Sequence, residues 1–138
     1  MSRTRRDAEE PGAMPLLAPA AYHMLLALAG GERHGYAIML EVNRLSEGAV
    51  RLGPGTLYRS LKSLLEQGLI EESGERPDPV HDDERRRYYR LTDLGQQVAQ
   101  AETQRLARLV ERARRTPGWG AALGGLAPSG APEPKGAR

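Results

Sequence analysis

"GPGTLYRSLKSLLEQGLI", Gly53 to Ile70, opens with a proline between two glycines and continues with the periodicity of a helix. Pro54 suits the first helical turn, where a missing N–H costs nothing, and Gly68 suits the C-terminal end. The apolar positions are leucines spaced as one stripe of a helix: Leu57, Leu61, Leu64 and Leu65. The stretch therefore predicts an amphipathic helix that begins at Pro54 and ends before Gly68.

The opposite face of this helix is polar, and its polar groups lie toward the helix start. It carries hydroxyl groups and cations: Thr56, Tyr58, Arg59, Lys62 and Ser63. Such groups bind phosphates and base edges, and the free N–H groups of a helix start favour anions. A solvated polar face is the plainer interpretation. The alternative is the second helix of a helix-turn-helix, whose outer face enters the major groove of DNA.

Two further helices precede this one. Apolar residues at helical spacing, with Pro19 near the start and two glycines at the end, predict a helix over residues 19–29. After a short turn, a second apolar pattern predicts a helix of about three turns over residues 36–45. We expect His34 at the start of that helix, either on the surface or as its cap.

Beyond Gly68 the pattern changes to two strand-like runs, "LIEES" and "RRYYRLT", joined by the polar loop "GERPDPVHDDER". Together they predict a β-hairpin wing. Strand alternation places Tyr89 and Leu91 on the core face. Arg85, Arg86 and Arg87 lie where a wing reaches a flanking groove or phosphate, and Arg86 and Arg87 are better candidates for a DNA contact than Arg85. The plainer interpretation is that this run of charge is only solvated.

A long helix is expected after the wing, with Thr92 as its cap and Arg115 near its end. Its apolar positions recur every three or four residues, and its other faces are charged. The segment after Thr116 is rich in Gly, Ala and Pro, so it offers no cover for them. We expect a second copy of the chain to cover the following positions: Leu94, Val98, Ala101, Leu106 and Leu109.

Three helices, a two-stranded wing and a terminal helix are the plan of a winged helix-turn-helix module. The chain has 138 residues, which is room for one domain with a modest core. We expect a mainly α fold with a small β wing and a C-terminal dimerisation helix. The expected segments are a disordered tail at residues 1–14, a winged helix-turn-helix DNA-binding domain at 15–91, the dimerisation helix at 92–115 and a disordered tail at 116–138.

Composition argues against an enzyme and against a metalloprotein. The chain has no Cys, and its three histidines, His23, His34 and His81, are far apart, so no metal site or cofactor is expected. No Gly-rich phosphate loop, G-x-S-x-G motif or carboxylate pair suited to acid–base catalysis is present. The longest apolar stretch is too short to span a bilayer and no signal peptide is evident, so we expect a cytoplasmic protein without membrane contact.

The chain resembles the PadR-like transcriptional regulators, and the likeness extends from about Leu16 to Arg115. The three motifs that carry it are His34-Gly35-Tyr36, Gly55-Thr56-Leu57-Tyr58 and Tyr88-Tyr89-Arg90-Leu91-Thr92, in that order. The single helix after the wing is similar to the branch of the family with a short C-terminal region.

The resemblance implies a homodimeric bacterial repressor that binds a palindromic operator in double-stranded DNA and is released by a small-molecule effector or a stress signal. By position it implies DNA contacts for Thr56, Tyr58, Arg59 and Lys62. The acidic loop at residues 78–84 departs from the family pattern.

A formal net charge of +2 is weak support for a nucleic-acid partner, so other interpretations stay open. One is a winged-helix module that holds a protein partner and never binds DNA. Another is a sensor that binds DNA only weakly and conditionally. Salt dependence separates a DNA-binding protein from an interaction module, because each phosphate that a protein neutralises releases counterions.

Overall fold

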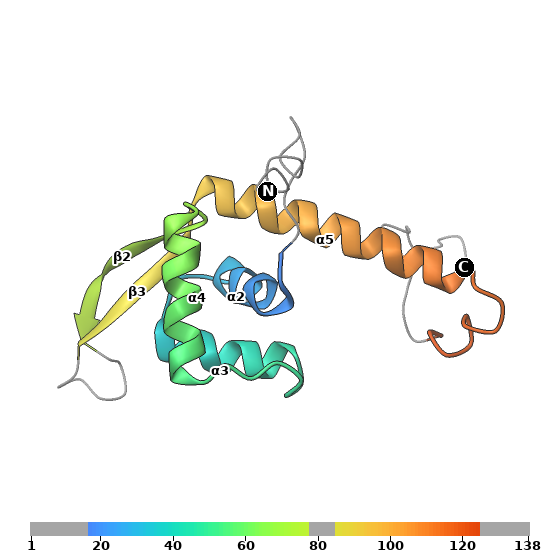
Figure 1. Cartoon of the computed structure of the whole chain (residues 1–138), viewed down its shortest axis with the longest axis horizontal. Coiled ribbons are helices and arrows are strands. Elements are labelled where there is room, and N and C mark those ends of the chain that lie inside the picture. The colour runs from blue at the N-terminus through green and yellow to red at the C-terminus, as the bar shows by residue number, and fades with distance from the viewer. Residues whose placement is uncertain (1–16, 78–84, 125–138) are drawn as a thin grey trace, which may run out of the picture. The chain divides into compact units, whose positions relative to one another are not determined.

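The computed structural model describes residues 17–77 and 85–124, which form helices and a small antiparallel sheet (Figure 1). In chain order the elements are α2 (Pro19–Ala29), β1 (Arg33–His34), α3 (Gly35–Leu45), α4 (Pro54–Glu66), β2 (Ile70–Pro77), β3 (Arg85–Leu91) and α5 (Asp93–Arg114). The helices expected before the wing, the wing itself and the terminal helix are all present. The chain divides into two compact units, residues 1–101 and 102–138, and α5 crosses the division.

The sheet has three antiparallel strands in the order β1-β3-β2. The sequence did not predict β1, because two residues are too few to show strand alternation; Arg33 pairs with Tyr89 and His34 with Tyr88. The predicted strand "LIEES" was too short, since β2 continues to Pro77 beyond an irregularity between Glu72 and Gly74. The rest of the wing loop, residues 78–84, lies outside the described residues.

The hydrophobic core of the first unit lies where α2, α3 and α4 meet the sheet and the start of α5. Three of the four predicted leucines of α4 are buried and Leu65 is half-buried. The core residues with the largest fully buried side chains are Met24, Leu25, Ile38, Val42, Leu64 and Ile70. Helical periodicity therefore identified the buried face of α4.

Hydrogen bonds end or begin three of the helices as the sequence predicted. Gly68, at φ 76°, follows α4 and donates its N–H to the carbonyl of Leu65 at 3.0 Å, in a conformation that glycine adopts without a Cβ clash. His34 Nδ1 accepts from the N–H of Ala37 at 3.1 Å and so caps α3, but its side chain is buried rather than on the surface. Thr92 Oγ1 accepts from the N–H of Gly95 at 3.0 Å at the start of α5.

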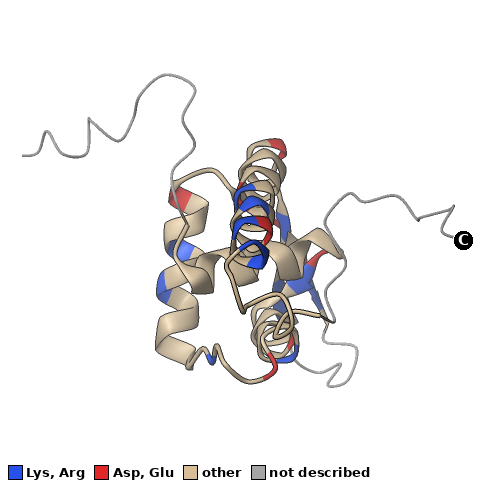
Figure 2. Cartoon of the chain, turned by 90° about the vertical axis from the view of Figure 1, so that its right-hand side faces the viewer, with Lys and Arg blue, Asp and Glu red and all other residues tan. Residues whose placement is uncertain are grey.

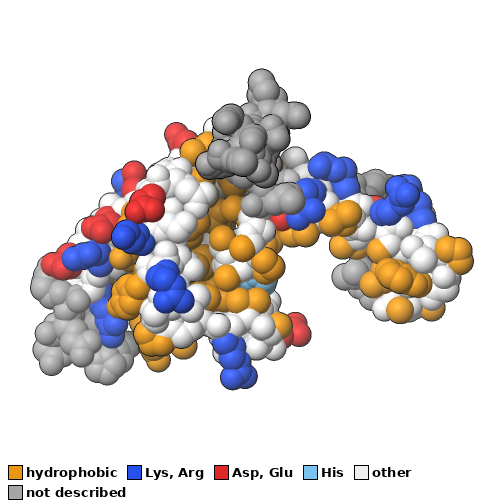
Figure 3. Space-filling view, viewed as in Figure 1, with side chains coloured by type: hydrophobic (Ala, Val, Ile, Leu, Met, Phe, Trp, Pro, Cys, Tyr) orange, Lys and Arg blue, Asp and Glu red, His pale blue; other side chains and the backbone are white. Residues whose placement is uncertain are grey.

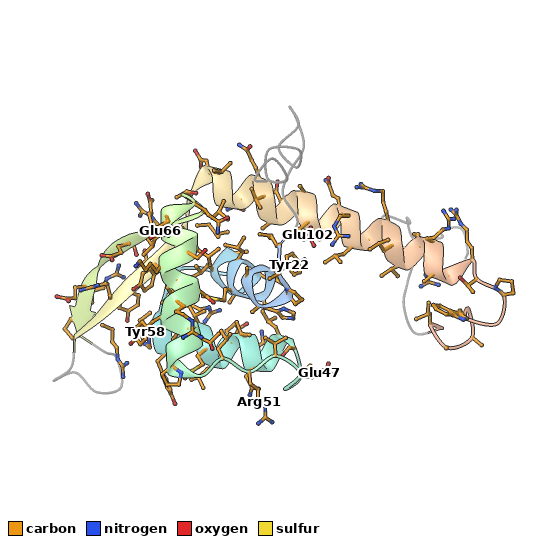
Figure 4. The ribbon with its side chains drawn as sticks, viewed as in Figure 1. Tyr22, Glu47, Arg51, Tyr58, Glu66 and Glu102 are labelled. Atoms are coloured by element: carbon orange, nitrogen blue, oxygen red, sulfur yellow. The ribbon has the colours of Figure 1, made fainter. Side chains whose placement is uncertain are left out.

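The second unit contains the C-terminal part of α5 followed by consecutive turns to residue 124. Glu102, labelled in Figure 4, accepts a hydrogen bond from Arg105 Nε at 3.0 Å, and this bond lowers the pKa of the carboxyl group. An unstructured tail was expected from Thr116. The structure instead has turns up to residue 124, in which the carbonyl of Trp119 accepts a hydrogen bond from the N–H of Leu123 at 3.2 Å. The tail expected at residues 1–14 and the part of the second tail after residue 124 lie outside the described residues.

The two adjacent tyrosines of β3 lie on opposite faces of the strand, as alternation predicted. Tyr89 is buried, whereas Tyr88 is half-buried with its ring 5.3 Å from that of His34 and 4.1 Å from the Arg76 guanidinium. Burial, and then the negative charge of Glu72, raises the pKa of the Tyr89 hydroxyl. The phenol therefore stays protonated in the core.

We expect Tyr89→Ala to lower the free energy of unfolding by about 3 to 5 kcal/mol, as removal of a buried aromatic ring usually does. Tyr88→Ala serves as the matched control and should cost less, because part of its ring is in contact with solvent. Urea titrations of both variants measure the two losses. An equal or larger loss for Tyr88→Ala would show that Tyr89 is not the tyrosine on which the core depends.

Candidate nucleic-acid interface

The start of α4 presents open backbone N–H groups to solvent. Its N-cap is Gly53, which has no side chain to accept from them, and Pro54 follows. The connection from α3 is held by Ser46, whose Oγ accepts from the N–H of Val50 at 2.9 Å. A helix start without a side-chain cap favours an anionic partner, because its N–H groups and the helix dipole both attract negative charge.

All five residues expected on the outer face of α4 are exposed. Tyr58 is 65% exposed and lies with wing residues around one hollow, so it marks the edge of α4 that faces the wing (Figure 4). Ser63 lies with residues of α2 around another hollow and marks the opposite edge. The charged residues of α4 are Arg59, Lys62 and Glu66, and Figure 2 shows charged positions along the helices in blue and red.

Both cations of this face keep their charge available. Within residues 17–77 and 85–124, Arg59 and Lys62 have no carboxylate within 4.0 Å of their side-chain nitrogens. Arg59 Nη2 donates instead to the neutral hydroxyl of Thr56, at 3.2 Å. The carboxylate of the helix, Glu66, is at its far end (Figure 4), away from the open N–H groups.

The wing is different, because two of its cations face carboxylates of the neighbouring strand. Arg87 Nη1 lies 3.7 Å from Glu72, and Arg90 Nε donates to Glu71 at 2.7 Å. Figure 3 shows acidic and basic side chains intermixed over this part of the surface. The positive field of the wing is therefore weaker than its run of arginines suggests.

A polar hollow of about 280 Å³ connects the wing with α4 and the start of α3. It brings together three of the predicted site residues, Tyr58, Arg86 and Arg87. Sequence analysis did not identify Tyr36 as a site residue. Tyr36 also lines the hollow, and its ring centre lies 5.7 Å from the Arg86 guanidinium. Thr56, Arg59, Lys62 and Ser63 are not among the residues that line it.

A further exposed cation precedes α4. Arg51 projects from the connection between α3 and α4 (Figure 4), and its Nε donates to the carbonyl of Gly48 at 3.3 Å. Its signal in the sequence is weak, because it is a single arginine shortly before the "GPGT" stretch. Together with the helix start it extends the positive surface beyond α4 itself.

The positions expected to form the dimer contact are not equivalent. Leu94 and Leu109 are 44% and 53% exposed, and Ala101 and Leu106 are half-buried. The expectation that no part of the same chain covers these positions is wrong for Val98, which is 4% exposed and belongs to the core of the first unit. The sequence also missed Val110, which is 40% exposed beside Leu109.

The part of the chain that the structure describes contains neither a candidate metal site nor a candidate membrane span. No group of three or more His, Asp or Glu side chains there could hold a metal ion, and His81 falls outside that part. None of the described helices combines the length and the apolar character needed to cross a bilayer.

The fold of this chain is similar to those of two solved structures. The chain resembles a PadR family transcription regulator from Clostridium difficile, at 23% identity and a TM-score of 0.55, over 70% of this chain and 95% of that one. It resembles Bacillus subtilis PadR, solved in complex with operator DNA, at 25% identity and a TM-score of 0.50, over 59% of this chain and 44% of that one.

In sequence, the chain is 36% identical over 89 residues to an uncharacterized 37.1 kDa protein in transposon Tn4556 of Streptomyces fradiae. The match covers 64% of this chain but only 23% of that protein, so the chain spans less than a quarter of this relative's length. The model of the transcriptional regulator PadR-like family matches residues 24–101, which is more than half of the chain. The chain therefore belongs to the PadR-like family of transcriptional regulators.

Proposed function

We propose that this protein is a sequence-specific regulator of transcription that binds double-stranded DNA with α4 in the major groove and the wing beside it. The observation that carries the proposal is the outer face of α4. That face is exposed, carries two cations with no ion pair among the described residues, and begins at open N–H groups. Groups of these kinds bind phosphates and base edges. The operator complex of Bacillus subtilis PadR supports DNA as the partner.

The proposed DNA contacts divide into two groups. Those on α4 are Tyr58, Arg59, Lys62 and Ser63, with Thr56 beside them as the hydrogen-bond partner of Arg59. Arg86 and Arg87 of β3 provide the wing contacts, and the carboxylate of Glu72, 3.7 Å from the Arg87 guanidinium, lowers the contribution of Arg87 to affinity. Arg51 is added as a phosphate contact on account of its exposure before α4.

The finer form of the proposal is a homodimeric repressor that binds a palindromic operator and is released by a small molecule or a stress signal. The exposed leucines of α5 support the dimer, since they give a second copy an apolar surface to cover. A two-fold dimer places its two recognition helices about one DNA turn apart, roughly 34 to 36 Å, and so requires a palindromic site. Release by an effector rests on the family resemblance.

Selection of bound duplexes from a random pool, sequenced after several rounds with the full chain, tests the proposal. We expect one enriched palindromic sequence. Its affinity should fall steeply with salt, with a slope of about −0.9 for each neutralised phosphate. If no sequence is enriched and binding to DNA is absent at low salt, the interaction-module interpretation replaces this one.

Arg59→Ala and Lys62→Ala should each weaken binding to the selected duplex without unfolding the protein, because both side chains lie on the exposed face of α4. A base contact is worth about 1 to 3 kcal/mol and acts at one base pair, whereas loss of a phosphate contact lowers the salt slope by about 1. Fluorescence anisotropy measures both effects. Arg115→Ala, which removes an exposed positive charge after α5, is the matched control. Unchanged affinity in both α4 variants would exclude α4 as the recognition helix.

A further inference from the structure

The arginine at the centre of the outer face of α4 has a defined side-chain position. Arg59 Nη2 donates to Thr56 Oγ1 at 3.2 Å, one turn earlier in the helix. A Cβ added at Gly55 would lie 3.5 Å from Arg59 Nη1, so the guanidinium also lies against the backbone of the first turn. It is therefore turned back toward the N-terminal end of α4, the end of a recognition helix that lies nearest the bases.

The partner that holds this guanidinium carries no charge. Arg87 and Arg90 are held by Glu72 and Glu71, and a carboxylate partner competes with DNA for the same N–H groups and cancels the positive charge. A hydroxyl group orients the guanidinium and leaves its charge intact. A guanidinium has five N–H donors, so four remain after the bond to Thr56.

From this arrangement, and resting on the proposed function, we propose that Arg59 recognises a guanine in each operator half-site and that Thr56 is a positioning residue for Arg59. The remaining donors are enough for two parallel hydrogen bonds to O6 and N7 of guanine, the pairing that an arginine makes in the major groove. Thr56 acts by reducing the number of positions that the long arginine side chain occupies before DNA binds.

The test uses the full chain and a duplex selected by it from a random pool. Each guanine of one half-site is replaced in turn by 7-deazaguanine, which lacks the N7 acceptor, and affinities are measured by fluorescence anisotropy. For the wild-type protein, we expect one guanine at which the replacement weakens binding about fivefold or more. For Arg59→Ala, the replacement should cause no loss of affinity at that guanine. At the other guanines it should have the same effect as in the wild-type protein.

Thr56 is tested in the same duplexes. Thr56→Val keeps the shape of the side chain and removes the hydroxyl group, so it should reduce the penalty for 7-deazaguanine at the Arg59 position. Thr56→Ser keeps the hydroxyl group and should restore the penalty. In the Arg59→Ala background, Thr56→Val should cause no further change, because a residue that acts only through Arg59 has nothing left to position. Thermal melting shows that each variant is folded.

Three results would overturn the inference in different ways. A 7-deazaguanine penalty that persists in Arg59→Ala would remove Arg59 as the guanine contact. An equal loss from Thr56→Val with and without Arg59 would make Thr56 a direct DNA contact and not a positioning residue. Failure to enrich any duplex would reject the proposed function itself, and this inference with it.

Discussion

Gly95→Ala is expected to lower the free energy of unfolding by about 3 kcal/mol or more, because the added methyl group has no room. A Cβ built on Gly95 would lie 2.0 Å from the carbonyl oxygen of Leu69 and 3.3 Å from the Leu91 side chain. The first of these neighbours is backbone and is held in place by the N–H of Thr92, at 3.1 Å. In an unpacked helix the same substitution stabilises by about 1 kcal/mol, so the close contact reverses the sign.

Urea titrations of the wild-type and Gly95→Ala proteins measure this loss. Gly53→Ala is the matched control: nothing lies within 4 Å of a Cβ at that position, and its φ of −76° suits any residue. We expect the control to change the free energy of unfolding by less than about 1 kcal/mol. A Gly95→Ala variant as stable as the wild type would mean that α5 does not pack this closely on the segment after α4.

The close approach at Gly95 also explains an element of the fold that the sequence pattern did not reveal. Periodicity showed that Leu94 and Val98 recur on a helix, but it does not say which apolar position faces the same chain and which faces a partner. Gly95 allows the first turns of α5 to lie against the core, and Val98 and Ala99 are buried there. A single glycine in a helix signals such an approach only once the neighbouring segment is known.

The fold was predictable where the pattern was long and regular. The bounds of α2 match the prediction from apolar spacing and a proline, and α4 begins at the proline from which it was predicted. Strands were predicted less well, because β1 has two residues and the outer part of β2 lacks an alternation of apolar and polar residues. Both strands are defined by their pairing with β3. The register of that pairing depends on residues that are far apart in the sequence.

The candidate site shows the same division. The exposed face of α4 followed from the leucine stripe opposite it, and its role in DNA binding stays a prediction. The wing arginines were visible as a run of charge, but the pairing of Arg87 with Glu72 was not. Glu72 precedes Arg87 by 15 positions, and only the pairing of β2 with β3 brings the two together at 3.7 Å.

The dimer is tested most directly at the exposed end of the apolar series in α5. Leu109 is 53% exposed, so Leu109→Glu should leave the fold of the single chain intact while placing a charge in the proposed contact with the second copy. Deletion of the whole helix is a poorer test, because Val98 and Ala99 belong to the core and their loss would destabilise the first unit. Gln104→Glu, at an exposed position of the same helix, is the matched control.

We expect light scattering at micromolar concentration to give twice the mass of one chain for the wild-type and Gln104→Glu proteins, and the mass of one chain for Leu109→Glu. Affinity for the selected palindrome should fall about 100-fold or more with the loss of the dimer, because the second half-site no longer binds as an intramolecular event. Affinity for a duplex with one half-site should be unchanged, since α4 and the wing are untouched. A Leu109→Glu protein that stays dimeric would place the contact elsewhere, and a wild-type protein that is monomeric would remove the reason to expect a palindrome.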